Sequence, residues 1–212
     1  MDENIRDFRK KILEKVKDNL EKNGFDKVVI VQTKEEAKRV VLDEIEEGKS
    51  VGIGGSQSIR EMGLIDELKK RNRLLIHSPS QSQEERLKIW REALTSDYYL
   101  CSVNAITYNG KLFFIDAYGN RLCAAIFGPK EVILVIGFNK IVMDEEEAML
   151  RIRNKAGVIN AIRLKKNTPC VKEGVCLDCN SEDRICNVIS ILMKRPKITE
   201  YLIVLSEEDL GY

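Results

Sequence analysis

Long apolar runs and an excess of charge of either sign are both missing from the sequence. No segment approaches the ~18 apolar residues that a membrane-spanning helix needs. Residues 1–21 are charged throughout and lack the continuous apolar stretch of a signal peptide. The 35 basic residues nearly cancel the 34 acidic ones, and the one short basic run, 163–166, is typical of a solvated loop. We therefore expect a cytoplasmic protein with no membrane insertion and no nucleic-acid partner.

Histidine and tryptophan each occur once, as His77 and Trp90. Ser56 lies in a Gly-Gly-Ser segment and not in a Gly-x-Ser-x-Gly elbow, so the sequence offers no context for a Ser-His-Asp triad. A lone histidine at the end of a strand is more often structural or solvated than catalytic. Trp90 falls within an amphipathic helical pattern, which favours a packing role.

The composition that is present, 43% hydrophobic and 33% charged residues, is that of an ordinary globular protein. Apolar runs alternate with amphipathic patterns, each closed by glycine or a polar turn. Along the first half of the chain we expect helices at 5–20, 34–47, 58–70 and 84–93, with strands at 28–31, 50–53 and 74–76 between them. This alternation predicts an α/β fold with a mainly parallel sheet flanked by helices. We expect a single domain over residues 1–212, with a cysteine-rich C-terminal insertion at about 168–187.

The second half of the chain departs from that rhythm. Asn109-Gly110 is a strong tight-turn signal between two apolar runs, and Asp144 with Glu147 three residues on indicates a helix from about 144 to 156. Ser181, followed by two acidic residues, predicts the start of a last helix. The remaining expected elements are strands at 98–107, 111–115, 132–136 and 201–205, and a hairpin-like or helical piece at 120–127.

A glycine-containing loop follows the second expected strand, and Gly54, Gly55, Ser56 and Ser58 are its candidate ligand-binding residues. Ser58 and Glu61 match the S-x-x-E capping box, so a helix is expected to begin near Ser58. Free amides at a helix start favour an anion, and ligands of open α/β sheets bind at the carboxyl ends of strands. The loop is neither a Walker loop nor a complete G-x-G-x-x-G. A plain tight turn is the alternative.

Polar residues also stand in and beside the apolar strands of the middle segment. Such side chains either complete a buried hydrogen-bond network or line a pocket. Lys140 follows an apolar strand at another carboxyl end, where it could meet an anion or lie in solvent. The remaining candidate ligand-binding residues are Asn104, Thr107, Asn120 and Arg121, and Asp116 is a candidate catalytic carboxylate.

Four cysteines fall within 17 residues, spaced C-x5-C-x2-C-x6-C: Cys170, Cys176, Cys179 and Cys186. Four thiolates suit either tetrahedral zinc or an iron–sulfur cluster. Free thiols, disulfides (disfavoured in a reducing cytoplasm) and a Cys-x-x-Cys redox pair are open alternatives. Cys186 is expected on the first turn of the last helix, where the dipole favours thiolate. Core packing is the expected role of Cys101 and Cys123.

Several motifs in order resemble one known family. They are Gly-Gly-Ser-x-Ser-x-x-Glu-x-Gly-Leu (54–64), Asn-Ala-Ile-Thr-x-x-Gly (104–110), Asp-x-x-Gly-Asn-Arg (116–121), Phe-Gly-Pro-Lys (127–130) and Val-Ile-Gly-x-Asn-Lys (135–140). Together they resemble the LUD family of lactate-utilisation proteins over most of the chain. The resemblance implies a fold like ribose-5-phosphate isomerase and CoA transferases. It also implies a link to systems that oxidise lactate through iron–sulfur subunits, which favours iron–sulfur over zinc at the cysteines.

The 104–110 segment is also similar to methylthioribose-phosphate isomerases. In that alignment Asn104 stands where those enzymes place a catalytic aspartate, and an amide cannot act as a base at neutral pH. Asp116 could supply the carboxylate instead.

These observations lead to a functional expectation and a rival. The expectation is a lactate-utilisation-type protein that binds a small anionic metabolite at the glycine loop and works as a subunit or accessory beside iron–sulfur redox subunits. The rival is an isomerase or transferase acting on a sugar phosphate or CoA ester, and a ligand sensor is a third possibility. No nicotinamide or flavin fingerprint is complete, so the sequence leaves open whether the protein is an enzyme.

Overall fold

The computed structural model describes residues 2–78 and 80–212, and a six-stranded sheet forms its centre. The strand order is β1-β10-β7-β4-β2-β3, and every neighbouring pair is parallel. The strands are β1 (Lys27–Val31), β2 (Ser50–Ile53), β3 (Arg73–Leu75), β4 (Tyr98–Cys101), β7 (Glu131–Gly137) and β10 (Glu200–Ser206). Since parallel strands end at the same edge, the loops that follow β2, β4 and β7 meet there.

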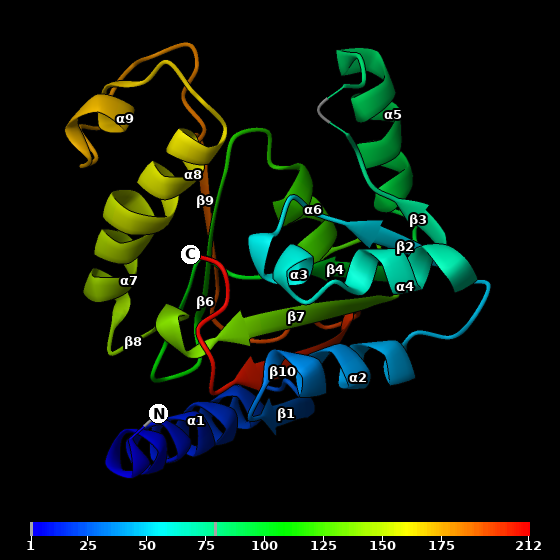
Figure 1. The fold of residues 1–212 in the computed structure, drawn as a ribbon, viewed down its shortest axis with the longest axis vertical. Coiled ribbons are helices and arrows are strands. Elements are labelled where there is room, and N and C mark those ends of the chain that lie inside the picture. Colours follow the sequence, from blue (N-terminus) through cyan, green and yellow to red (C-terminus); the bar gives the residue numbers. More distant parts are fainter. Residues whose placement is uncertain (1, 79) are drawn as a thin grey trace.

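Helices cover both faces of this sheet (Figure 1). They are α1 (Glu3–Lys22), α2 (Lys34–Glu44), α3 (Gln57–Glu61), α4 (Leu64–Arg71), α5 (Gln83–Ala93) and α6 (Asn120–Ile126). Side chains of α1, α5 and α6 share one apolar cluster with one face of the sheet, and those of α2, α3 and α4 share another with the opposite face. None of the helices in the described part of the chain is long and apolar enough to cross a membrane.

The central strand β7 shows why its sequence is apolar throughout. Leu134 and Ile136 point into the cluster under α1 and α6, while Ile133 and Val135 point into the cluster under α2 and α3. A strand covered on both faces needs apolar residues at every position and not at alternate ones. The expected α/β fold with a mainly parallel, helix-flanked sheet is therefore confirmed.

A second, smaller sheet stands beside the first, with strand order β8-β5-β6-β9. Its strands are β5 (Ala105–Thr107), β6 (Leu112–Asp116), β8 (Ile141–Val142) and β9 (Val188–Leu192). One long helical stretch packs on it through Ala148 and Ile152. That stretch comprises α7 (Glu145–Arg151), a π-helical segment (Ile152–Gly157) and α8 (Val158–Arg163), and α9 (Pro169–Glu173) follows. In Figure 1, α7 and α8 lie end to end across the view from α5.

The expected single strand at 98–107 is wrong in one respect, because two sheets divide it. β4 ends at Cys101 inside the parallel sheet, and residues 102–104 lead into β5 of the smaller sheet. The expected turn at Asn109-Gly110 does join β5 to β6, and Gly110 has the positive φ of 79° that favours glycine.

Of the three helix starts predicted from capping residues, the one near Ser58 is confirmed in position but not in its cap, and the one at Ser181 is wrong. The Ser58 hydroxyl caps no helix; it donates to Leu210 O, and α3 begins at Gln57. Ser181 starts a turn, because Asp183 accepts hydrogen bonds from Lys166 Nζ and Asn167 N, and the chain then enters β9. Cys186 therefore precedes a strand and is not on a helix.

The third expected start, at Asp144, is confirmed. Its carboxylate accepts from Glu147 N as an N-cap. The helical stretch that follows runs to Arg163, seven residues past the expected end at Ala156, since its π-helical segment continues directly into α8.

Candidate functional site

A cavity of about 500 Å³ lies at the carboxyl edge of the parallel sheet. Its wall is formed by the residues after β2 (55–58), β4 (102–104) and β7 (Lys140), together with α8, β6 and α6. Side chains from α5, residues of the segment 182–187 and Tyr212 also line it. This volume lies in the range of pockets that bury most of a small-molecule ligand.

Lys140 is the deepest charged group of this cavity. The residue is 2% exposed, and its Nζ donates to Ser58 Oγ and Ser102 Oγ, each at 2.8 Å. Burial, together with the positive charges of Arg151 and Arg121, lowers the pKa of Lys140 to about 7. The amine is therefore charged in part of the molecules and neutral in the rest at neutral pH.

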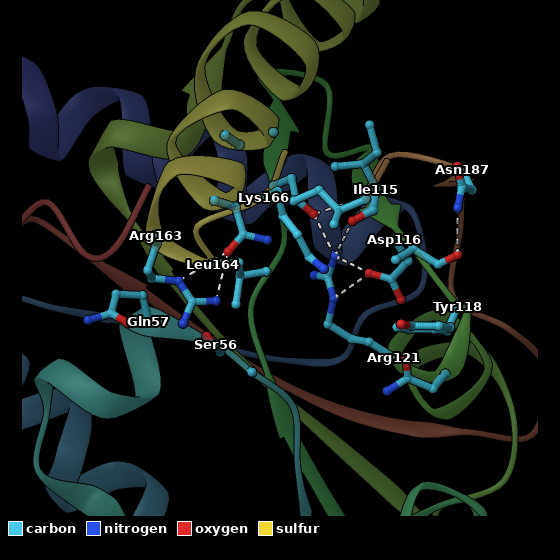
Figure 2. A pocket seen from close by; sticks show the side chains of 18 of the residues that line it. Ser56, Gln57, Ile115, Asp116, Tyr118, Arg121, Arg163, Leu164, Lys166 and Asn187 are labelled. Carbon is cyan, nitrogen blue, oxygen red and sulfur yellow. Dashed lines mark hydrogen bonds and ion pairs between the residues drawn. The ribbon is translucent and has the colours of Figure 1, made fainter. Parts of the chain in front are cut away.

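Arg121 and Asp116 form a buried ion pair in the cavity wall (Figure 2), and Ser102 links Arg121 to Lys140. Asp116 Oδ1 accepts from Arg121 Nε at 2.9 Å and Nη2 at 2.7 Å, while its Oδ2 accepts from Leu122 N at 3.1 Å. Arg121 also donates to Asn104 Oδ1, Ser102 O and Ile115 O. Asp116 thus accepts hydrogen bonds from three N–H groups, two of Arg121 and one of Leu122. This carboxylate fixes Arg121 in place and is not free in this arrangement to act as a base.

Three basic side chains of the cavity wall form no ion pair with a carboxylate in the described residues: Arg86, Lys140 and Arg163. The other basic residues of the wall are paired: Arg121 with Asp116, Lys166 with Asp183 and Arg184 with Asp178. Arg86 Nε is also buried without a hydrogen-bond partner. Arg163 and Gln57 both line the cavity, and Arg163 donates to the amide oxygen of Asn160 (Figure 2). The cavity thus carries positive charge that an anion would neutralise.

An aromatic group closes the side of the cavity formed by α5. Trp90 Nε1 donates to His77 Nδ1 at 3.1 Å, and the Trp90 and Tyr118 rings lie 5.1 Å apart. Burial lowers the pKa of His77, with Arg60 and Arg86 adding to the effect. His77 therefore lines the cavity as a neutral acceptor, and Trp90 is in a position to report on ligands.

The glycine loop contributes space to the cavity. No atom lies within 4 Å of a Cβ placed on Gly55, whereas one on Gly54 would come within 3.2 Å of Tyr99 Oη. Neither glycine has a positive φ. Gly54 therefore permits close packing, and Gly55 leaves open room where a side chain would otherwise project.

The sequence-predicted ligand residues are mostly brought together here. Those that line the cavity are Gly55, Ser56, Ser58, Asn104, Asn120, Arg121 and Lys140, with the candidate catalytic Asp116. Gly54 lies behind the wall. Thr107 is fully buried away from it, where its hydroxyl accepts from Lys111 N in the 107–111 turn.

Several cavity residues were not expected from the sequence. Ser102 gave no signal beyond its place after an apolar strand, and Tyr212 reaches the site from the other end of the chain. Arg163 and Lys166, expected in a solvated loop, border the cavity. Arg163 is the last residue of α8 and Lys166 follows directly after the turn that ends it, so the end of this helix brings both to the cavity.

The four clustered cysteines surround a second, small cavity of about 20 Å³. Among the residues that the structure describes, no three His, Cys, Asp or Glu side chains stand close enough to hold a metal ion. The donor set nevertheless has the chemistry that a cluster or zinc needs, since no carboxylate lines this cavity. Burial raises the pKa of Cys186, and Arg184 opposes that effect. Cys123 differs from expectation: it is exposed, whereas Cys101 is buried in the core as expected.

The cysteine cavity and the large cavity share part of a wall. Gly157, Arg184 and Ile185 border both. Gly157 ends the π-helical segment, and such segments occur frequently at functional sites.

A parallel sheet covered by helices on both faces, with a basic cavity at the carboxyl ends of its strands, defines an α/β domain of the class whose ligands bind at that edge. The model of the LUD domain matches residues 13–205. The chain therefore belongs to the LUD domain family. It is also similar in fold to a crystal structure of a DUF162 family protein from Deinococcus radiodurans, with 13% identity, a TM-score of 0.50, and coverage of 93% of this chain and 98% of that one. A comparison with curated proteins gave no match.

Proposed function

We propose that this protein binds a small organic anion in the 500 Å³ cavity and serves lactate oxidation as a subunit or accessory. The observation that carries the proposal is the set of basic side chains without a carboxylate partner, Arg86, Lys140 and Arg163. Lys140 is buried and Arg86 is half-buried, and a cation held there without a counter-charge is unfavourable, which a bound carboxylate or phosphate would relieve. Arg163 is exposed and adds positive charge to the same wall.

The family supports the lactate part of the proposal, since LUD domain proteins are associated with lactate utilisation. Lactate and its oxidation product are the smallest candidates for the ligand. The cavity has room for more than a three-carbon acid, so a larger carboxylate or a phosphate ester also fits its charge.

The cysteine segment forms the second part of the proposal, in which Cys170, Cys176, Cys179 and Cys186 hold an iron–sulfur cluster, with zinc as the alternative. A cluster would supply one-electron transfer. The wall shared by the two cavities would place such a centre next to the ligand, and this adjacency supports a role beside iron–sulfur redox subunits.

The rival function receives less support from the geometry. An isomerase or transferase acting on a sugar phosphate or CoA ester would need Asp116 or Glu61 as its base. Glu61 does not line the cavity and accepts a hydrogen bond from Gly211 N. Both oxygens of Asp116 are already engaged, by Arg121 and by the Leu122 amide.

The first experiment follows the fluorescence of Trp90, the only tryptophan, during titration with lactate, pyruvate and inorganic phosphate. We expect a saturable change with at least one anion and none with lactamide, the neutral analogue of lactate. Arg86→Met should raise the Kd about tenfold or more, because a hydrogen bond to a charged group contributes ~1.5–3 kcal/mol.

Arg91→Met is the matched control, since Arg91 lies on the same helix, is exposed and does not line the cavity. Equal responses to lactate and lactamide would contradict anion binding. So would an equal loss of affinity in the two arginine variants.

A further inference from the structure

The two serines that hold Lys140 have already used their own protons. Ser102 Oγ donates to Val135 O at 2.6 Å, and Ser58 Oγ donates to Leu210 O at 3.2 Å. A hydroxyl has one proton to donate and lone pairs to accept with. Both serines can therefore only accept hydrogen bonds from Lys140.

This arrangement fits the neutral amine better than the ammonium ion. A neutral primary amine has two N–H groups and one lone pair, and the two serine oxygens take both N–H groups. An ammonium ion would have a third N–H, for which no acceptor lies within reach among the described residues. The lone pair of the neutral form is left without a partner.

The charged groups around Lys140 act in the same direction. Arg151 on α7 and Arg121 on α6 oppose a third positive charge, while Glu61 on α3 and Cys101 on β4 favour it less strongly. Arg151 Nη2 is itself buried without a partner. Arg86 and Arg163 stay charged at any accessible pH, so they can hold an anion while Lys140 is neutral.

We propose that Lys140 is a nucleophile that forms an imine with the aldehyde or ketone carbon of an anion bound in the cavity. The inference rests on the proposed function and narrows the ligand to carbonyl-bearing anions, such as small 2-oxo acids.

The step is balanced without an oxidant or reductant. The Nζ lone pair attacks the carbonyl carbon, and a proton moves from nitrogen to the former carbonyl oxygen to give a carbinolamine. Loss of water then leaves a C=N bond, and addition of water reverses the reaction. Ser58 and Ser102 keep the amine oriented, which makes them positioning residues.

The same three residues could in principle catalyse acyl transfer, with Lys140 as the base for a serine nucleophile. This alternative fits the hydrogen bonds less well. That chemistry needs a serine hydroxyl that donates to Nζ. Both hydroxyls here donate to backbone carbonyls.

The test is reductive trapping at neutral pH. The protein is incubated with sodium cyanoborohydride and either pyruvate or formaldehyde, the latter a carbonyl that needs no anion site. Peptide mass spectrometry then locates the adducts. At pH 7 the neutral fraction of Lys140 (pKa about 7) exceeds that of a surface lysine roughly 10³-fold, so we expect Lys140 to be modified first with both reagents.

Variants separate the nucleophile from its surroundings. Lys140→Met should abolish the preferred adduct, and Ser102→Ala should slow trapping at Lys140 and move its pH midpoint. Lys130→Met should change nothing at Lys140, because Lys130 is a surface residue paired with Asp97 outside the cavity.

The outcomes distinguish the two proposals. The inference would be overturned if pyruvate altered Trp90 fluorescence but formed no adduct at Lys140, and formaldehyde showed no preference for Lys140. The proposed anion binding would then still stand. Preferred formaldehyde trapping at Lys140 without any anion binding would support the nucleophile and refute the proposed function.

Discussion

Some residues of this site both stabilise the fold and line the cavity. Asn104 and Asp116 were expected either to complete a buried network or to line a pocket. They do both: each hydrogen-bonds Arg121, and each borders the cavity. Their polar character in an apolar strand was visible in the sequence. Their common partner was not, because only the fold brings the start of α6 back against β6.

The pKa of Lys140 should be measurable as a pH dependence of stability. It is about 7 in the folded protein against 10.5 for a free lysine. Between these values the unfolded chain binds more protons than the folded one, so the contribution of Lys140 to folding becomes more favourable as pH rises. Lys140→Met removes this effect. The variant should therefore have its greatest relative stability at or below pH 7 and lose that advantage steadily towards pH 10.5.

Urea unfolding of both proteins at several pH values in this window gives the measurement. Lys130→Met is the control. Asp97 raises the pKa of Lys130, so Lys130 stays protonated in both the folded and the unfolded protein over most of this pH window. A stability difference between Lys140→Met and the wild type that stays constant with pH would contradict a lowered pKa.

At the scale of elements, the strands of the parallel sheet were predictable and those of the smaller sheet were less so. Buried runs such as 132–136 need apolar residues at every position, which leaves a clear pattern. β9 was not expected, because Ser181 and the two acidic residues after it imitate the start of a helix. Its β-branched run Val188–Leu192 was the competing signal. Pairing with β6, more than 70 residues earlier, decided the outcome.

The cysteine segment makes a prediction at this scale. Protein purified without oxygen should contain iron and acid-labile sulfide in comparable amounts, with visible absorption. Cys176→Ser or Cys179→Ser should remove both, because each thiolate is proposed as a ligand. Cys123→Ser should retain them, since Cys123 is exposed on α6 and does not line the cysteine cavity. If the protein instead contained stoichiometric zinc, the cysteines would form a structural zinc site. Protein without any metal would refute the metal centre.

On the scale of the whole molecule, the site joins segments from both ends of the chain. The last residues cross the carboxyl edge of the sheet, where Leu210 N donates to Asn139 Oδ1 and Gly211 N donates to Glu61. No local pattern in residues 207–212 indicates this position. The sequence could therefore predict the glycine loop as a binding element but not the segment that completes the site.

Gly211 offers a test of whether this crossing supports ligand binding. Its φ is +58°, and a Cβ there would lie 2.8 Å from Ser58 Oγ and 3.0 Å from Ser58 N. Gly211→Val should lower the free energy of unfolding by at least ~1–2 kcal/mol, the cost of placing a residue with a Cβ in the left-handed conformation. It should also displace the Leu210 carbonyl that fixes Ser58, loosen Lys140 and raise the Kd for the anion several-fold.

Gly48→Val is the matched control for that substitution. Gly48 has a φ of +78° and no atom within 4 Å of an added Cβ, so it carries the same backbone strain far from the site. Denaturant unfolding and the Trp90 titration should show both variants destabilised and only Gly211→Val impaired in binding. Equal affinities in the two variants would mean that the crossing segment stabilises the fold without organising Ser58 and Lys140. The binding site would then depend on the sheet and its loops alone.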